Sequence, residues 1–210
     1  MLLLCLAVGA FVGLHFWVGA SPLRGRLVSW LGEGPFKGLY SLVLIGLMAL
    51  IVLAYRAAPA VPLWSLGDIG GLIAIAGSWL GLVLIVASFL SPRAEDGTRI
   101  VHQLTRHPMN WGIALLTGAH ALAVGEVAAL VLFGGMMLLA VYGSLLLDRR
   151  QRAAAGSEQG LETGTDPAGF WLGATLGLRG SLVMSGRLGL AVFLLATALA
   201  VAVWSVHRTG

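Results

Sequence analysis

Six stretches of this sequence are apolar over lengths that match the thickness of a lipid bilayer. They cover residues 2–19, 39–54, 69–90, 109–124, 127–147 and 188–206. A membrane-spanning helix needs about 20 apolar residues, and backbone amides inside lipid must be paired within their own segment. The second and fourth stretches are short and are expected to extend into their flanks. The sequence therefore predicts an all-α fold, a polytopic membrane bundle of about six transmembrane helices in a single domain over 1–210.

The composition excludes a water-soluble globule. Only 10% of the residues are charged and 58% are hydrophobic, whereas soluble domains carry about 25% charged residues. The net charge of +4 does not indicate nucleic-acid binding, because the basic residues flank the apolar stretches, where they contact lipid headgroups. Cys5 is the only cysteine, so the chain can form neither an internal disulfide nor an all-cysteine metal site.

The basic residues predict the orientation in the membrane. Loops 20–38, 91–108 and 148–187 fall on one side and hold eleven of the thirteen, namely Arg24, Arg26, Lys37, Arg93, Arg99, Arg106, Arg149, Arg150, Arg152, Arg179 and Arg187. The other side holds only Arg56 and Arg208. By the positive-inside rule these loops are cytoplasmic and both termini are periplasmic, as in a multi-pass protein of the bacterial inner membrane. Loop 148–187 is the one sizeable cytoplasmic segment.

Local signals predict several details of the bundle. The small residues before Ser21 resemble a signal-peptide cleavage site, but no Lys or Arg precedes them, so this segment is expected to be a retained helix. Gly125-Glu126 predicts a tight helical hairpin. The Gly-x-x-x-Gly pairs at Gly9/Gly13 and Gly77/Gly81 indicate close helix contacts. Thr105 is a candidate cap and Pro108 a candidate first-turn residue of the fourth span.

Two histidines lie inside the predicted spans. His15 lies near the cytoplasmic end of the first span and His120 beyond the middle of the fourth. Ionisable groups within a bilayer are costly and mark functional sites, and two imidazoles on different helices are a known way to hold a b-type haem. Equally, each imidazole can bond a neighbouring hydroxyl or carbonyl, and Thr117 is available for such packing.

Basic residues also gather where the fourth span begins. Arg106 and His107 at a helix N-terminus suit an anion-binding corner on the cytoplasmic rim. At the end of the fifth span, Asp148-Arg149-Arg150 is more typical of a positively charged membrane anchor.

These residues carry a resemblance to the NnrU family of bacterial membrane proteins and to its plant and cyanobacterial relative, zeta-carotene isomerase. The resemblance extends to about residue 152 and includes His15, Ser21-Pro22-Leu23-Arg24, Gly38-Leu39-Tyr40-Ser41, Thr105-Arg106-His107-Pro108, Gly112, Ala119-His120 and Asp148-Arg149-Arg150. For NnrU members it implies a role linked to nitrite and nitric oxide metabolism, that is, to denitrification. For the isomerase relatives it implies haem b held by membrane histidines and used to isomerise a cis double bond. Carried over by position to this sequence, the resemblance implies that His15 and His120 are the axial haem ligands. It also implies that Arg106 and His107 lie near the reactive part of the site.

Two other functions stay open. Arg106-His107-Pro108 followed by Gly112 also resembles the isoprenylcysteine and phospholipid methyltransferases, which bind S-adenosylmethionine. Here, however, Asn110 stands where those enzymes commonly carry tyrosine, and the later glutamate pair is missing. Alternatively, the protein is a non-enzymatic assembly or maturation factor that acts through a membrane-protein partner. An enzyme of the isomerase type would instead take an apolar or polyene substrate.

Overall fold

The computed structural model describes residues 1–20, 23–90, 101, 105, 107–155, 194–195 and 197–198. Within these residues six helices are present: α1 (Leu2–Ala20), α2 (Leu23–Leu31), α3 (Glu33–Arg56), α4 (Gly67–Leu90), α6 (Pro108–Val124) and α7 (Val127–Ala155). Five of the predicted spans are confirmed as helices. Of the sixth, 188–206, only four residues are described, and these are helical.

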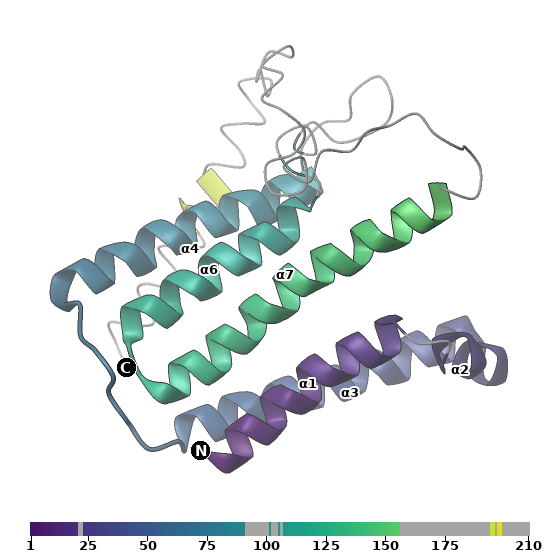
Figure 1. Cartoon of the computed structure of the whole chain (residues 1–210), viewed down its shortest axis with the longest axis horizontal. Helices are drawn as coiled ribbons and strands as arrows, with labels where there is room; N and C mark the ends of the chain where they lie inside the picture. The colour runs from purple at the N-terminus through teal and green to yellow at the C-terminus, as the bar shows by residue number, and fades with distance from the viewer. Residues whose placement is uncertain are drawn as a thin grey trace, which may run out of the picture.

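The helices form a bundle in which α4, α6 and α7 lie side by side and α1 packs against α3 and α7 (Figure 1). Successive long helices run in opposite directions (Figure 1), so their ends alternate between the two ends of the bundle. One end carries the described basic residues Arg24, Arg26, Lys37 and Arg149, and we call it the basic end. This alternation agrees with the predicted grouping of loops.

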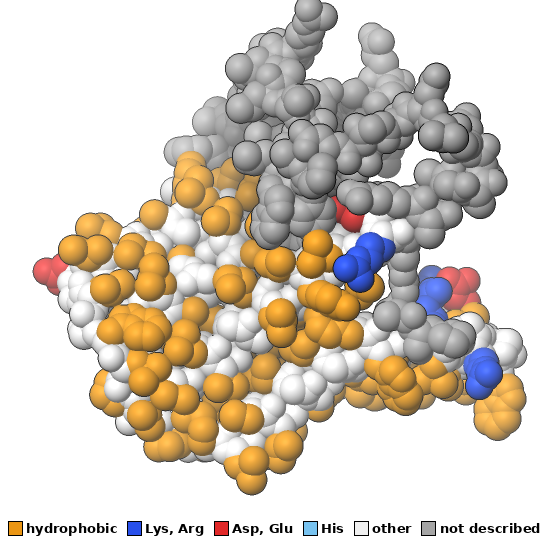
Figure 2. All heavy atoms as spheres, viewed as in Figure 1, with side chains coloured by type: hydrophobic (Ala, Val, Ile, Leu, Met, Phe, Trp, Pro, Cys, Tyr) orange, Lys and Arg blue, Asp and Glu red, His pale blue; other side chains and the backbone are white. Residues whose placement is uncertain are grey.

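The outer surface of the bundle is suited to lipid. On α3, Leu39, Leu42 and Leu53 are each more than half exposed. Figure 2 shows hydrophobic side chains over the body of the described bundle and charged ones at its ends. Within the described part of the chain, three helices are long and apolar enough to cross a membrane, or four if the bent pair α1 and α2 is one span. The protein is an all-helical membrane bundle.

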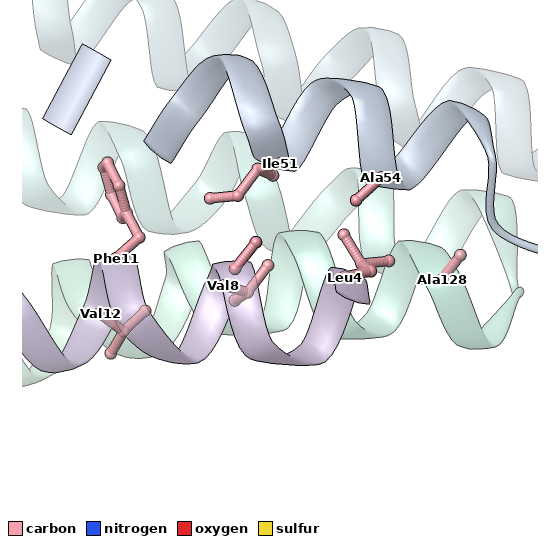
Figure 3. Packing of buried hydrophobic residues seen from close by; sticks show 8 residues of the cluster. Leu4, Val8, Phe11, Val12, Ile51, Ala54 and Ala128 are labelled. Carbon is pink, nitrogen blue, oxygen red and sulfur yellow. The ribbon is translucent and has the colours of Figure 1, made fainter. Parts of the chain in front are cut away.

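The core of the bundle lies where α1 meets α3 and α7. Leu4 and Ile51 have no exposed surface, and Val8, Phe11 and Ala128 are buried with them (Figure 3). Leu4, Val8 and Phe11 are four and three positions apart on α1, which places them on one face of that helix. The same face leads, one turn beyond Phe11, to His15.

The closest helix contact is between α4 and α6. A Cβ added at Gly81 would lie 2.5 Å from the carbonyl oxygen of Gly112, and one added at Gly77 would collide with Ala119. The contact predicted from Gly77 and Gly81 is therefore confirmed. The contact predicted from Gly9 and Gly13 is wrong for the described residues, because no atom lies within 4 Å of a Cβ at either position.

The predicted hairpin at Gly125 is confirmed. Gly125 ends α6 with a positive φ of 64°, which glycine adopts without steric cost. Its carbonyl oxygen accepts hydrogen bonds from the backbone N–H of Leu63 and of Trp64. The indole N–H of Trp64 donates to the carbonyl oxygen of Leu122 at 2.8 Å. The loop between α3 and α4 thus clamps the hairpin between α6 and α7.

Three local predictions need correction. The predicted loop 20–38 contains a helix, α2, and the first turns of α3. The predicted loop 148–187 begins as helix, since α7 continues to Ala155; residues 156–187 lie outside the described residues. The N-cap of α6 is His107 rather than Thr105 and makes no side-chain capping bond, whereas Pro108 occupies the first turn as predicted.

Candidate functional site

A cavity of about 480 Å³ lies between α1, α3, α6 and α7. This volume is within the range of small-molecule and cofactor sites, about 300–1,000 Å³. Its lining residues are Phe11, His15, Phe16, Met48, Met109, Asn110, Ile113, Met136, Leu139, Ala140, Gly143, Leu146 and Leu147. The lining is apolar except for two side chains, those of His15 and Asn110.

His15 presents one particular nitrogen to a ligand. Its Nδ1 lies 3.0 Å from the carbonyl oxygen of Phe11, one turn earlier on α1. A carbonyl can only accept, so Nδ1 carries a hydrogen, and in the neutral imidazole Nε2 then has the lone pair. The ring of Phe11 packs against the imidazole with a centroid separation of 4.6 Å. Metal-binding histidines commonly have this arrangement, in which the second ring nitrogen donates to a backbone carbonyl.

His120 has the same chemistry in a different place. Its Nδ1 donates to the carbonyl oxygen of Leu116 at 2.9 Å and approaches the Ser78 hydroxyl at 3.5 Å. Its ring packs on Phe133 of α7 at 5.0 Å between centroids. These contacts are of the kind that the alternative to a haem ligand predicts, namely a histidine that bonds a carbonyl or hydroxyl within a helix interface.

The structure does not bring the two histidines to a common cavity. His15 lines the cavity between α1 and α7, whereas His120 is not among the lining residues and contacts α4 and α7. On α6 the lining residues Asn110 and Ile113 belong to the first two turns, while His120 lies about 10 Å further along the axis than Ile113 at 1.5 Å per residue. His15 and His120 therefore lie at different depths in the bundle, as the sequence predicts.

A row of polar residues joins α6 to α7 at the basic end. The Nε2 of His107 lies 2.9 Å from Oδ1 of Asp148. One turn further into the bundle, the Asn110 amide donates to the Ser144 hydroxyl at 3.1 Å. We call these four residues the polar ladder. Its inner pair borders the cavity, because Asn110 is a lining residue and Gly143 lines the cavity beside Ser144.

The anion-binding corner expected of Arg106 and His107 stays a prediction. His107 bonds a carboxylate, but that carboxylate belongs to Asp148 of the same chain. Arg106 lies outside the described residues. Among these residues, no group of three or more His, Cys, Asp or Glu side chains is placed to hold a metal ion. A metal carried by a porphyrin needs only axial ligands from the protein, so a single histidine is sufficient to begin such a site.

Sequence reasoning missed Asn110, Ser144 and the pairing of Asp148 with His107. Asn110 was noted only as the replacement of a tyrosine. The sequence does contain a signal for both pairs. The two residues of each pair lie at similar sequence distances from the hairpin at Gly125, which folds α6 back against α7.

The fold and the cavity define a class of protein, an all-helical membrane protein with a largely apolar cavity between its helices that is lined by one imidazole. The comparison with protein families then identifies its family. A model described as "NnrU protein" matches residues 1–209. The chain belongs to the NnrU family. No curated protein and no solved structure matches it significantly.

Proposed function

We propose that this protein binds haem b in the cavity between α1, α3, α6 and α7, with His15 as an axial ligand, and that it acts in nitrite and nitric oxide metabolism. The observation that carries the proposal is the imidazole of His15, whose Nδ1 is bonded to the Phe11 carbonyl, which leaves Nε2 of the neutral ring for a metal, in a cavity where Asn110 is the one other polar lining side chain. The role in nitrogen-oxide metabolism rests on the family resemblance.

The residues present fit such a group in their chemistry. A macrocycle gains stability from apolar walls, and Met48, Ile113 and Leu139 supply them. Bound haem supplies an iron that exchanges electrons and takes diatomic ligands. The protein's own contribution is to hold Nε2 of His15 in one tautomer through the Phe11 carbonyl, and to exclude water with its apolar walls.

Three residues are candidates for a second ligand of the haem iron. His120 is implied by the resemblance and has its Nε2 lone pair available. Met48 and Met136 are implied by the cavity that they line, and a His–Met pair is an established haem coordination. For the described arrangement of the helices we propose a methionine as the second ligand; coordination by His120 would require α6 to shift along its axis.

The methyltransferase alternative fits the cavity less well. S-adenosylmethionine carries an ammonium, a carboxylate and a sulfonium, each of which needs a polar or charged contact. The cavity offers only His15 and Asn110 for this purpose. The isomerase-like activity and the assembly role are both compatible with an apolar cavity. For each of them, the first thing to establish is whether haem is bound.

The basic end is proposed to face the cytoplasm of a bacterial inner membrane, because the described helices place Arg24, Arg26, Lys37 and Arg149 together there. We thus propose that the protein is multi-pass and that its cavity extends from the middle of the bundle toward the cytoplasmic side.

The test is the haem content of the full-length protein purified in detergent, measured from its absorption spectrum and by extraction of the haem. We expect a Soret band in the wild type, its loss in His15→Ala, and its retention in Ser78→Ala, which leaves the cavity intact. Electron paramagnetic resonance then distinguishes a bis-histidine from a His–Met site. A haem-free protein after expression with excess haem would reject the proposal.

A further inference from the structure

We infer that Asn110 recognises the polar end of the ligand in this cavity, and that this polar end is a carboxylate on an apolar body. The inference deepens the proposed function, because it concerns the same cavity, and it also holds for a ligand other than haem. It rests on the orientation of the Asn110 amide, the polarity of the cavity from one end to the other, and the charges around its basic end.

The orientation of the Asn110 amide follows from its neighbours. The Ser144 hydroxyl donates its only hydrogen to the carbonyl oxygen of Ala140 at 3.0 Å. Its oxygen can therefore only accept from Asn110, so the amide nitrogen rather than the amide oxygen faces Ser144. One hydrogen of that nitrogen is used in this bond, and the second is a donor that Ser144 does not use. Ser144 is 2% exposed, so this hydrogen bond is shielded from water.

The polar side chains that line the cavity lie toward one of its ends, where Met109, Leu146 and Leu147 line it as well. Met48, Met136 and Leu139 lie in the middle of their helices, and the two polar lining residues lie nearer the basic end. A ligand that fills the cavity buries its apolar body against the middle of the bundle and directs a polar end toward Asn110. Apolar contact in the middle and polar contact at the rim is the usual way in which membrane proteins accommodate such molecules.

The charges at this end favour a negative group. Arg24, Arg26 and Arg149 are exposed at the basic end, and none of them is part of a described salt bridge; Arg24 interacts with Glu33 only through its longer-range charge. The two acids described there are already matched: Glu33 pairs with Lys37, and Asp148 is bonded by His107. A carboxylate beside Asn110 would accept the second amide hydrogen within a positive potential.

Two ligands share this chemistry, a haem with its propionates and a long-chain fatty acid, and both have neutral esters. The experiment titrates the full-length protein in detergent with haem and with haem dimethyl ester, and separately with cis-parinaric acid and its methyl ester. Absorbance follows the first pair and fluorescence the second. In at least one pair we expect the acid to bind about tenfold more tightly than its ester, because a hydrogen bond to a charged group is worth about 1.4 kcal/mol or more.

Substitutions assign the preference to Asn110. Asn110→Leu keeps the volume of the side chain but removes the donor, and should bring the affinities of acid and ester together. Ser144→Ala removes the same contact between α6 and α7 while leaving the Asn110 amide, and should retain most of the preference. Equal affinities of acid and ester in the wild type would overturn the inference, as would an equal loss in both variants.

The outcomes separate this inference from the proposed function. A preference for the fatty acid without haem binding would uphold the role of Asn110 and reject the haem site. Haem binding with no preference for the acid over its ester in either ligand pair would uphold the haem site and reject the role of Asn110.

Discussion

The Nε2 atom of His107 lies 2.9 Å from Oδ1 of Asp148, and this bond joins the N-cap of α6 to α7 across 41 residues of sequence. The two side chains are only 12% and 4% exposed. Together with the contact between Asn110 and Ser144 one turn away, it fixes how α6 and α7 face each other beside the cavity.

Replacing Asp148 with alanine should destabilise the folded bundle. The change leaves the buried imidazole of His107 without this acceptor, and such losses cost about 1–3 kcal/mol. Thermal unfolding in detergent would show a lower midpoint for Asp148→Ala. The exposed pair of Glu33 and Lys37 is the control, and Glu33→Gln should leave the midpoint unchanged. Equal midpoints for Asp148→Ala and the wild type would show that the bond contributes nothing.

Alanine at Gly81 should weaken the bundle, whereas alanine at Gly13 should not. The added methyl group at Gly81 meets the backbone of Gly112, and overpacking of this kind costs about 1–3 kcal/mol. At Gly13 the methyl group enters open space, and alanine is the better helix former. Unfolding midpoints measured side by side would decide. A larger loss for Gly13→Ala would mean that α1 has a neighbour at this position.

Two glycines with positive φ offer a matched comparison at the loop ends. Gly67 has φ 53° and Gly125 has φ 64°. Alanine in this conformation costs about 1–2 kcal/mol at either position. At Gly125 the new methyl group would also collide with Trp64 and open the clamp between the two loops, while at Gly67 it meets no atom within 4 Å. Limited proteolysis and thermal unfolding should therefore show a greater loss for Gly125→Ala; similar losses would argue against the clamp.

Reporter fusions test the orientation. A fusion after Gly125 should report the periplasm, and one in the segment after Gln151 should report the cytoplasm, because the basic residues mark the cytoplasmic side. Alkaline phosphatase activity at the first position and fluorescence of a cytoplasmic reporter at the second are the measurements. The reverse pattern would invert the bundle in the membrane and contradict the proposed location of the polar ladder.

The sequence predicted the elements that depend on local properties. Apolar length located α1, α3, α4, α6 and α7, and Gly125 located the hairpin, because lipid solubility and backbone freedom are properties of short segments. It missed α2 because Leu23–Leu31 contains two arginines and is not apolar. It gave a close contact to both glycine pairs, whereas among the described residues Gly77 and Gly81 make one and Gly9 and Gly13 do not, since the spacing of small residues does not say which face has a neighbour.

The site was less accessible to sequence reasoning. His15 was identified because an imidazole inside an apolar helix is unusual, and its place in the cavity is consistent with a ligand role. The relation between His15 and His120 depends on how far α6 is displaced along its axis, which no local pattern specifies. The polar ladder depends on pairs 34 and 41 residues apart that meet only after the hairpin folds.

Chemical rescue of His15→Gly is the most direct test of the central claim, that the imidazole of His15 is a haem ligand. The substitution removes the ring from the cavity and leaves room for free imidazole to enter. We expect the full-length variant to lose the Soret band of the wild type in detergent and to regain it when haem and imidazole are added together. A variant that keeps the wild-type spectrum without imidazole, or a wild-type protein that takes up no haem, would contradict the claim.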